Sequence, residues 1–189
     1  MVNHSKIGKK SKGIGKRYER RCSKILTEFT GIAFRSTPSS GGFNKQGVII
    51  REELFCGDLI CDDPNFLFCI EAKNRKSFSI TALLKNPETA AFTKWWYQCI
   101  DDAKTVGLKP LMFFKPNRQD DCIVLTHKDY IEIFGNYSEI PMLIATIYNK
   151  TCKIIIDKEE ILTNLPTPVM IDWKQFTKYC NPKLMFRSN

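Results

Sequence analysis

The sequence is poor in histidine and has no closely spaced cysteine pair, and these two absences exclude the common zinc sites. Its only histidines, His4 and His127, lie far apart and away from any group of cysteines. The eight cysteines are scattered, none forms a Cys-x-x-Cys pair, and most lie within apolar runs. Structural zinc requires four ligands of these types at short spacings, so no zinc site is expected. We predict that the cysteines are reduced core residues of an intracellular protein.

Long apolar runs are also missing. No uninterrupted apolar segment approaches the roughly 20 residues that span a bilayer. The N-terminus lacks the apolar stretch of a signal peptide. We therefore expect a protein with no membrane partner that is cytoplasmic, nucleoid-associated, or located in the host cytoplasm if the source is a virus.

Acidic residues are scarce at the N-terminus. The formal net charge of the 189 residues is +9, and residues 1–24 contain nine Lys or Arg against one acid, Glu19. Such a concentrated positive segment favours a polyanionic partner, because each neutralised phosphate releases a condensed counterion. A solvated tail that aids solubility is the alternative, and charge alone does not separate the two. The candidate phosphate contacts in this segment are Lys9, Lys10, Lys12, Lys16, Arg17 and Arg20.

The first half of the chain alternates helical and extended patterns. Residues 1–15 are rich in Gly, Lys and Ser and have too few apolar residues to order alone, which predicts a flexible basic arm. From Lys16 the apolar residues recur at helical spacing, with Gly31 just past the helix end. A helix start signal at residues 86–88 precedes a second helical stripe that ends at Gly107. Strands are expected at residues 32–37, 56–61, 66–74, 110–115 and 122–126.

The last third of the chain continues this alternation. Thr126 is placed to cap a short helix that ends at Phe134. A hairpin is expected from residues 142–148 and 152–157, and a terminal helix near residues 172–180. We divide the chain into the arm (1–15), a core (16–126) and a C-terminal extension packed on the core (127–189). The order of elements predicts an α/β fold with a mixed β-sheet flanked by helices.

Two charged residues interrupt the apolar strand at residues 66–74. Side chains alternate along a strand, so Glu71 and Lys73 share one face. A turn at residues 62–65 would pair position 58 with position 69. Asp58 would then be a diagonal neighbour of Glu71 on the same face, roughly 7 Å away.

This arrangement suits phosphodiester hydrolysis. Two carboxylates can hold one hard cation, which neutralises charge on the phosphate and lowers the pKa of bound water. Lys73 can orient the water and stabilise the charge that grows on the phosphorane. The alternative is an ordinary surface ion pair between Glu71 and Lys73. The apolar neighbours on their face favour burial and therefore the catalytic interpretation. Mg²⁺ is the predicted ion, and Mn²⁺ is expected to substitute for it.

Gly57 and Asp58, twelve intervening residues, and then Glu71-Ala72-Lys73 resemble the bipartite motif of the PD-(D/E)XK nuclease superfamily. The resemblance implies a restriction-endonuclease-like core. Glu19 in GKRYERR and the stretch FRSTPSSGG at residues 34–42 further resemble the archaeal-type Holliday-junction resolvases. The resemblance covers about residues 13–126. It departs from the superfamily at Gly57, where the motif has proline, and at residues 44–56, which look longer than in the family.

The resemblance implies a DNA endonuclease that cuts branched DNA or four-way junctions as a homodimer. It assigns metal ligation to Asp58, Glu71, Glu19 and Ala72. The implied catalytic residues are Lys73, Glu71, Asp58, Glu19, Ser40 and Gln98, with Ser39 as the alternative to Ser40. Arg35, Arg75 and Lys76 join the basic N-terminal residues as candidate DNA contacts.

Two other functions fit the sequence. One is a different nuclease of the superfamily, such as a restriction-like, nicking or flap enzyme, because these share the same catalytic face. The other is a non-catalytic DNA-binding protein, for which the basic segment would suffice. Trp95 and Trp96 could stack on bases, but their helical spacing favours a place in the core.

Overall fold

A computed structural model describes residues 4–37, 56–76, 78–79, 90–116, 118–135, 142–148, 151–155 and 167–188, with the backbone alone for residues 4–12, 142–148 and 151–155. The helices are α1 (His4–Thr30), α3 (Ala91–Thr105), α4 (His127–Phe134) and α5 (Trp173–Tyr179), with a short 3₁₀ helix η4 (Pro182–Met185). The strands are β1 (Phe34–Ser36), β2 (Leu59–Cys61), β3 (Phe68–Arg75), β4 (Lys109–Pro116), β5 (Cys122–Thr126), β6 (Met142–Tyr148), β7 (Thr151–Ile155) and β8 (Pro168–Asp172).

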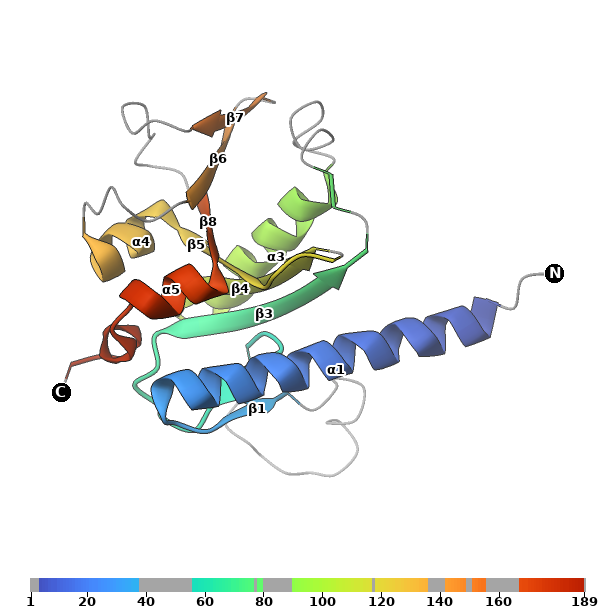
Figure 1. Ribbon diagram of the computed structural model, residues 1–189, viewed down its shortest axis with the longest axis horizontal. Coiled ribbons are helices and arrows are strands. Elements are labelled where there is room, and N and C mark those ends of the chain that lie inside the picture. The colour runs from blue at the N-terminus through green and yellow to red at the C-terminus, as the bar shows by residue number, and fades with distance from the viewer. Residues whose placement is uncertain are drawn as a thin grey trace.

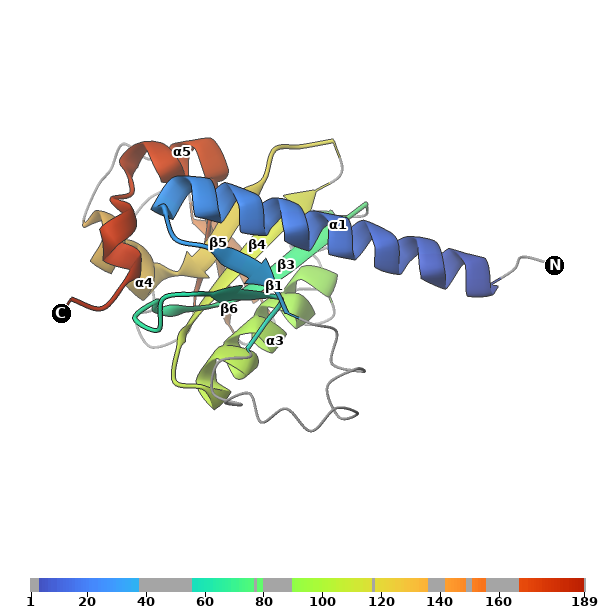
Figure 2. The same ribbon diagram turned by 90° about the horizontal axis from the view of Figure 1, so that it is seen from below.

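The strands form one mixed sheet in the order β1-β2-β3-β4-β5-β8-β6-β7. β3 and β4 are parallel and the other neighbouring strands are antiparallel. Helices α1, α4 and α5 cover one face and α3 covers the other (Figures 1 and 2). The mixed sheet between helices confirms the predicted α/β class.

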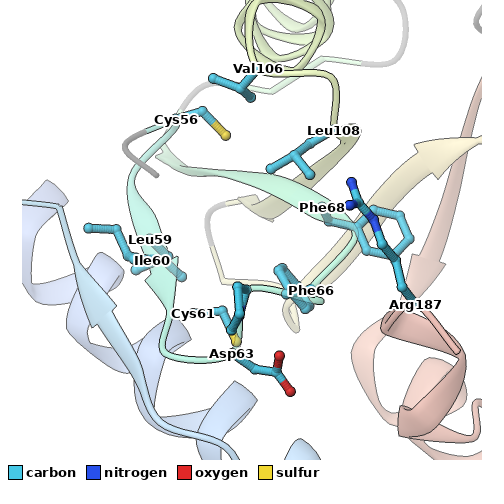
Figure 3. A pocket seen from close by; sticks show the side chains of 11 residues that line it. Cys56, Leu59, Ile60, Cys61, Asp63, Phe66, Phe68, Val106, Leu108 and Arg187 are labelled. Carbon is cyan, nitrogen blue, oxygen red and sulfur yellow. The ribbon is translucent and has the colours of Figure 1, made fainter. Parts of the chain in front are cut away.

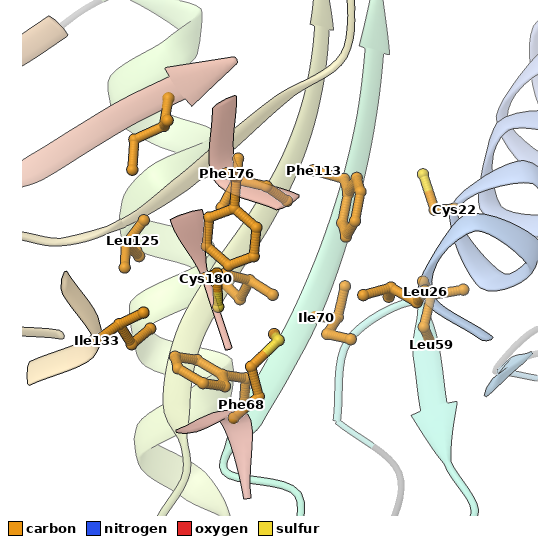
Figure 4. Packing of buried hydrophobic residues seen from close by; sticks show 14 of the residues in the cluster. Cys22, Leu26, Leu59, Phe68, Ile70, Phe113, Leu125, Ile133, Phe176 and Cys180 are labelled. Atoms are coloured by element: carbon orange, nitrogen blue, oxygen red, sulfur yellow. The ribbon is translucent and has the colours of Figure 1, made fainter. Parts of the chain in front are cut away.

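The larger core lies between the sheet and the face covered by α1, α4 and α5. Cys22 and Leu26 of α1 meet Ile70 of β3 there, with Phe113 of β4 and Phe176 of α5 close by (Figure 4). These five side chains are almost fully inaccessible to solvent. Burial of this apolar surface holds β3 in the centre of the sheet, between layers of helices.

Helix α1 is longer than predicted. It begins at His4 instead of Lys16, so the prediction of a flexible arm over residues 1–15 is wrong for residues 4–15. Lysine has good helix propensity and the segment has no proline, so the helix extends from the turns that pack on the sheet, at one hydrogen bond per added residue. Its basic N-terminal turns extend beyond the sheet, on the side toward which β3 runs (Figures 1 and 2).

The register between β2 and β3 differs from the prediction by two residues. Leu59 pairs with Ile70, whereas a turn at residues 62–65 would pair it with position 68. The connection is longer because Phe66 forms a bridge to Phe186, and the Leu67 N–H donates to the Met185 carbonyl at 3.0 Å. The C-terminal segment therefore takes the hydrogen bonds that the hairpin would have used. A shift of two residues keeps each side chain on its predicted face.

Two further element boundaries differ. Helix α3 begins at Ala91, after the extended Ala90, and the start signal at residues 86–88 lies outside the described residues. Strand β8 was not predicted, and it lies between β5 and β6. Strands β6, β7 and β8 of the C-terminal part thus continue the same sheet, and Phe176 of α5 belongs to the same core as α1.

Several short elements agree with the sequence. The β6–β7 hairpin is confirmed. The predicted cap of α4 is also confirmed, because Thr126 Oγ1 accepts a hydrogen bond of 3.0 Å from the Asp129 N–H. Trp96 is buried as predicted and Trp95 is partly buried. In the described part of the chain, no helix is long and apolar enough to cross a membrane.

The prediction that all cysteines are reduced is wrong for one pair. Cys56 and Cys69 form a disulfide, with their Cα atoms 5.6 Å apart. The two are 13 residues apart in sequence, and only the pairing of β2 with β3 brings them together. The cysteines that are free in the described part of the chain are Cys22, Cys61, Cys99, Cys122 and Cys180.

Candidate active site

Asp58 lies at the point where β2 and β3 separate. Its N–H donates to the Ile70 carbonyl at 2.7 Å. Its Oδ2 accepts a hydrogen bond of 2.9 Å from the Ala72 N–H. The carboxylate therefore lies between the strands, where the next backbone hydrogen bond of the ladder would be. Leu59 pairs with Ile70, and Asp58, the residue before Leu59, is close enough to Glu71 for its charge to raise the pKa of that carboxyl group.

Gly57 gives Asp58 this position. Its φ is +68°, and a Cβ there would collide with the Ile70 carbonyl. Thr37 supports the turn, because its N–H donates to the Asp58 carbonyl and its Oγ1 donates to the Gly57 carbonyl, both at 2.8 Å. Proline is restricted to φ near −65° and cannot adopt this conformation. The departure from the superfamily motif at this position thus has a structural reason.

Glu71 and Lys73 face α3, and the Lys73 ammonium donates to Glu71 Oε1. Their β4 partners are Met112 and Phe114, which belong to the apolar cluster under α3. Glu71 is only 4% exposed. Burial, followed by the nearby Asp58 carboxylate, raises the pKa of Glu71 to about 7, while Lys73 acts in the opposite direction. The Glu71 carboxyl group therefore binds its proton more tightly than an ordinary glutamate does.

Glu19 approaches the site from α1. Burial raises the pKa of its carboxyl group, and the charge of Asp58 raises it further, while Lys73 is among the cations that lower it. Glu19 is therefore within electrostatic reach of both residues. Gln98 is exposed on α3, and no hydrogen bond joins it to Lys73 among the described residues. Ser39 and Ser40 lie outside the described residues.

The donor atoms suit a hard divalent cation. Among the described residues, no three His, Cys, Asp or Glu side chains lie close enough to bind one ion. Mg²⁺ needs fewer protein ligands, because it keeps several waters and binds through one or two carboxylates plus substrate phosphate. Asp58 and Glu71 provide such a pair. The Ala72 carbonyl points to the same side as its N–H, toward Asp58, because both groups of a strand residue face one neighbour.

A sequence profile of the family described as "Phage putative PDDEXK endonuclease" matches residues 9–178. The chain belongs to this PDDEXK family. It is 30% identical over 118 residues to protein D14 of Escherichia phage T5. The aligned region covers 61% of this chain and 70% of protein D14. The chain also resembles the solved structure of Hjc, a Holliday junction resolvase of Archaeoglobus fulgidus. That match has a TM-score of 0.40 and 14% identity, and covers 89% of this chain and 95% of Hjc.

The candidate DNA contacts of this PDDEXK nuclease lie in three places. Lys16, Arg17 and Arg20 are exposed on α1. Lys9, Lys10 and Lys12 lie in the same helix, but their side chains are outside the described part. Arg75 and the exposed Lys76 follow Lys73 at the end of β3. Arg35 forms an ion pair with Asp62 beside the β2–β3 connection.

Two residues near the site, Asp102 and Thr37, were not singled out from the sequence, and neither was the contact between Trp95 and Arg75. Asp102 of α3 adds to the effects of burial and Asp58 that raise the pKa of Glu71. It follows the buried Cys99 by one helical turn, so helical spacing contained a signal for it. Thr37 and the stacking of Trp95 on Arg75 depend on long-range contacts, and the sequence contained no signal for either.

A cavity of about 290 Å³ lies at the opposite end of β3 (Figure 3). Its walls are mostly apolar and include Phe66, Phe68 and Leu108, with Asp63 and Arg187 as its charged residues. Glu71 and Lys73 do not line it. The candidate active site of this PDDEXK nuclease is therefore separate from this cavity.

Proposed function

We propose that this chain is a metal-dependent DNA endonuclease in which Asp58 and Glu71 bind Mg²⁺ or Mn²⁺ and Lys73 assists the hydrolysis. One observation carries the proposal: the Asp58 carboxylate accepts a hydrogen bond from the N–H of Ala72, the residue between Glu71 and Lys73. Membership of a PDDEXK nuclease family supports the same chemistry.

The residues have separate tasks. When bound, the divalent ion neutralises charge on the scissile phosphate and makes water more acidic. Glu71 must lose its proton to act as a ligand, and Lys73 helps by stabilising the carboxylate with which it is paired. The Lys73 ammonium also stands one strand position past Ala72, where it can stabilise negative charge on the phosphorane.

The proposed substrate is branched DNA, with the four-way junction first, cut by a homodimer whose two sites nick symmetric strands. Two features support this choice. Glu19 lies within electrostatic reach of Asp58 and Lys73, as the resemblance to junction resolvases implies. The basic turns of α1 extend past the end of β3 (Figure 1), where they can follow a DNA arm. We expect such an enzyme to act in the cytoplasm.

A non-catalytic DNA-binding protein is the competing function, and the burial of Glu71 argues against it. A carboxylate that is 4% exposed and faces the charge of Asp58 destabilises the folded state. DNA binding through α1 requires no such group, whereas metal-dependent hydrolysis does.

The experiment compares the full chain with Asp58→Ala on four-way junction, duplex and flap DNA, in Mg²⁺, in Mn²⁺ or in chelator. The matched control is Asp101→Ala, which removes an exposed carboxylate of α3. Paired symmetric nicks on the junction, lost only in Asp58→Ala, would support the proposal. A preference for duplex or flap DNA would assign another substrate to the same site. Binding of DNA without cleavage in any metal would contradict the nuclease function. The molar mass in solution tests the dimer.

A further inference from the structure

The end of β3 carries an arginine stacked on a tryptophan. The guanidinium carbon of Arg75 lies 4.9 Å from the centre of the Trp95 ring, so the contact joins β3 to α3. The Trp95 ring also lies against Phe114, with 6.1 Å between the ring centres. Phe114 is the β4 partner of Lys73. Trp95 therefore contacts both the β4 partner of the candidate catalytic lysine and the arginine beyond that lysine.

Arg75 and Lys73 point to the same face of β3. Alternate residues of a strand are roughly 6.6 Å apart, a spacing that suits contacts with neighbouring phosphates of one DNA strand. Other basic residues near the sheet have carboxylate partners, such as Arg35 with Asp62. Within the described part of the chain, no ion pair joins Arg75 to a carboxylate. Among the residues that the structure describes, no carboxylate therefore competes with an anion for its N–H donors.

We propose that Trp95 is a positioning residue that orients Arg75 to bind the DNA phosphate next to the scissile one. The proposal rests on the proposed nuclease function. A guanidinium can stack its plane on an aromatic ring while its edge donates two parallel hydrogen bonds to a phosphate. A lysine ammonium cannot do both. Because the stack orders the arginine side chain before DNA arrives, less conformational entropy is lost on binding.

Two other roles for Trp95 make different predictions. If the ring stacked on a DNA base, its removal would weaken binding whether or not Arg75 is present. If it were only part of the core, its removal would lower stability and would not depend on Arg75. The dependence on Arg75 thus separates positioning from both alternatives.

The test is a double-mutant cycle on the full chain with Arg75→Ala, Trp95→Ala and the double variant. Binding to four-way junction and duplex DNA is measured in chelator, so that no cleavage occurs, over a range of salt concentrations. We expect Arg75→Ala to weaken binding about tenfold and to reduce the salt slope by about one. Trp95→Ala should weaken binding about threefold. It should have no further effect when Arg75 is already absent.

Matched variants control for charge and for folding. Tyr97→Ala removes an aromatic ring of the same helix that is 44% exposed, and Lys94→Ala removes an exposed lysine of that helix. Both should bind DNA like the wild type. Trp95→Phe keeps a ring and should retain most of the binding, whereas Arg75→Lys keeps the charge and should bind nearly as weakly as Arg75→Ala. In cleavage assays, KM should rise while kcat stays within about twofold.

The proposal would be overturned if Trp95→Ala weakened DNA binding equally with and without Arg75. It would also be overturned if Trp95→Ala lowered the melting temperature and kcat and left KM unchanged. Failure of the proposed function gives a different result. If the wild type cut no DNA in Mg²⁺ or Mn²⁺, the binding cycle in chelator would still report whether Trp95 acts through Arg75.

Discussion

The Asp58 carboxylate accepts a hydrogen bond of 2.9 Å from the N–H of Ala72, the residue between Glu71 and Lys73. This bond joins the two halves of the motif, which are separated by twelve residues in the sequence. It also explains how a carboxylate can stand between two strands, because it satisfies a backbone donor that the separating ladder leaves free.

We expect Asp58→Asn to fold normally and to lose cleavage. The amide oxygen can still accept the Ala72 hydrogen bond, but the charge that attracts the metal ion is gone. Cleavage of DNA in Mg²⁺ should fall about 1000-fold, which corresponds to about 4 kcal/mol of transition-state stabilisation. Asp101→Asn, at an exposed position of α3, should cleave like the wild type. Substantial cleavage by Asp58→Asn would show that this carboxylate is not a metal ligand.

Gly57→Ala should destabilise the protein much more than Gly107→Ala. Both glycines have φ of +68°, but a Cβ at Gly57 meets the Ile70 carbonyl while a Cβ at Gly107 meets nothing within 4 Å. Urea denaturation should show a loss of about 1 kcal/mol for Gly107→Ala, from backbone conformation alone. The loss for Gly57→Ala should be about 3 kcal/mol, because the collision adds to this cost. Equal losses would mean that the collision is relieved without cost.

Stability in chelator should fall as pH rises through the range in which Glu71 titrates. The folded state binds this proton more tightly than the unfolded chain, because burial and then Asp58 raise the pKa of Glu71 from 4.5 to about 7. The stability contributed by the proton is therefore present below pH 4.5 and is lost as pH approaches 7. The change should be roughly 3 kcal/mol, because a difference of one in pKa corresponds to about 1.4 kcal/mol. It is measured as the difference between the wild type and Glu71→Gln in urea denaturation at several pH values. A difference that does not change with pH would contradict the raised pKa.

The Cys56–Cys69 disulfide should contribute to stability. It closes a loop with a sequence separation of 13. Closing such a loop stabilises by about 3 kcal/mol, because it restricts the unfolded chain. A reductant should lower the urea midpoint of the wild type and leave that of the double variant Cys56→Ser, Cys69→Ser unchanged. Cys61→Ser, at a free cysteine of the neighbouring strand, should respond to reductant like the wild type. An unchanged wild-type midpoint would contradict the bond.

Much of the fold follows from local patterns. The alternation in β3 and the helical spacing in α3 predicted both elements to within a few residues, because each period depends only on neighbouring residues. Long-range pairing was less predictable. Strand β8 was missed because five residues that include a proline carry a weak strand signal. Its position in the sheet depends on pairing with β5, more than forty residues earlier in the chain.

The sequence by itself determined that Glu71 and Lys73 share a face of an apolar strand, because alternation along a strand is a local property. It predicted Asp58 as their acidic partner from a hairpin and from the resemblance to the nuclease motif. Only the tertiary structure decided how they meet. Phe186 and Met185 of the C-terminal segment bind Phe66 and Leu67, so Leu59 pairs with Ile70, and the Asp58 carboxylate binds the N–H of Ala72. The same packing brings Arg75 onto Trp95 and Cys56 onto Cys69. These contacts join distant segments, and no local period specifies which segments will meet.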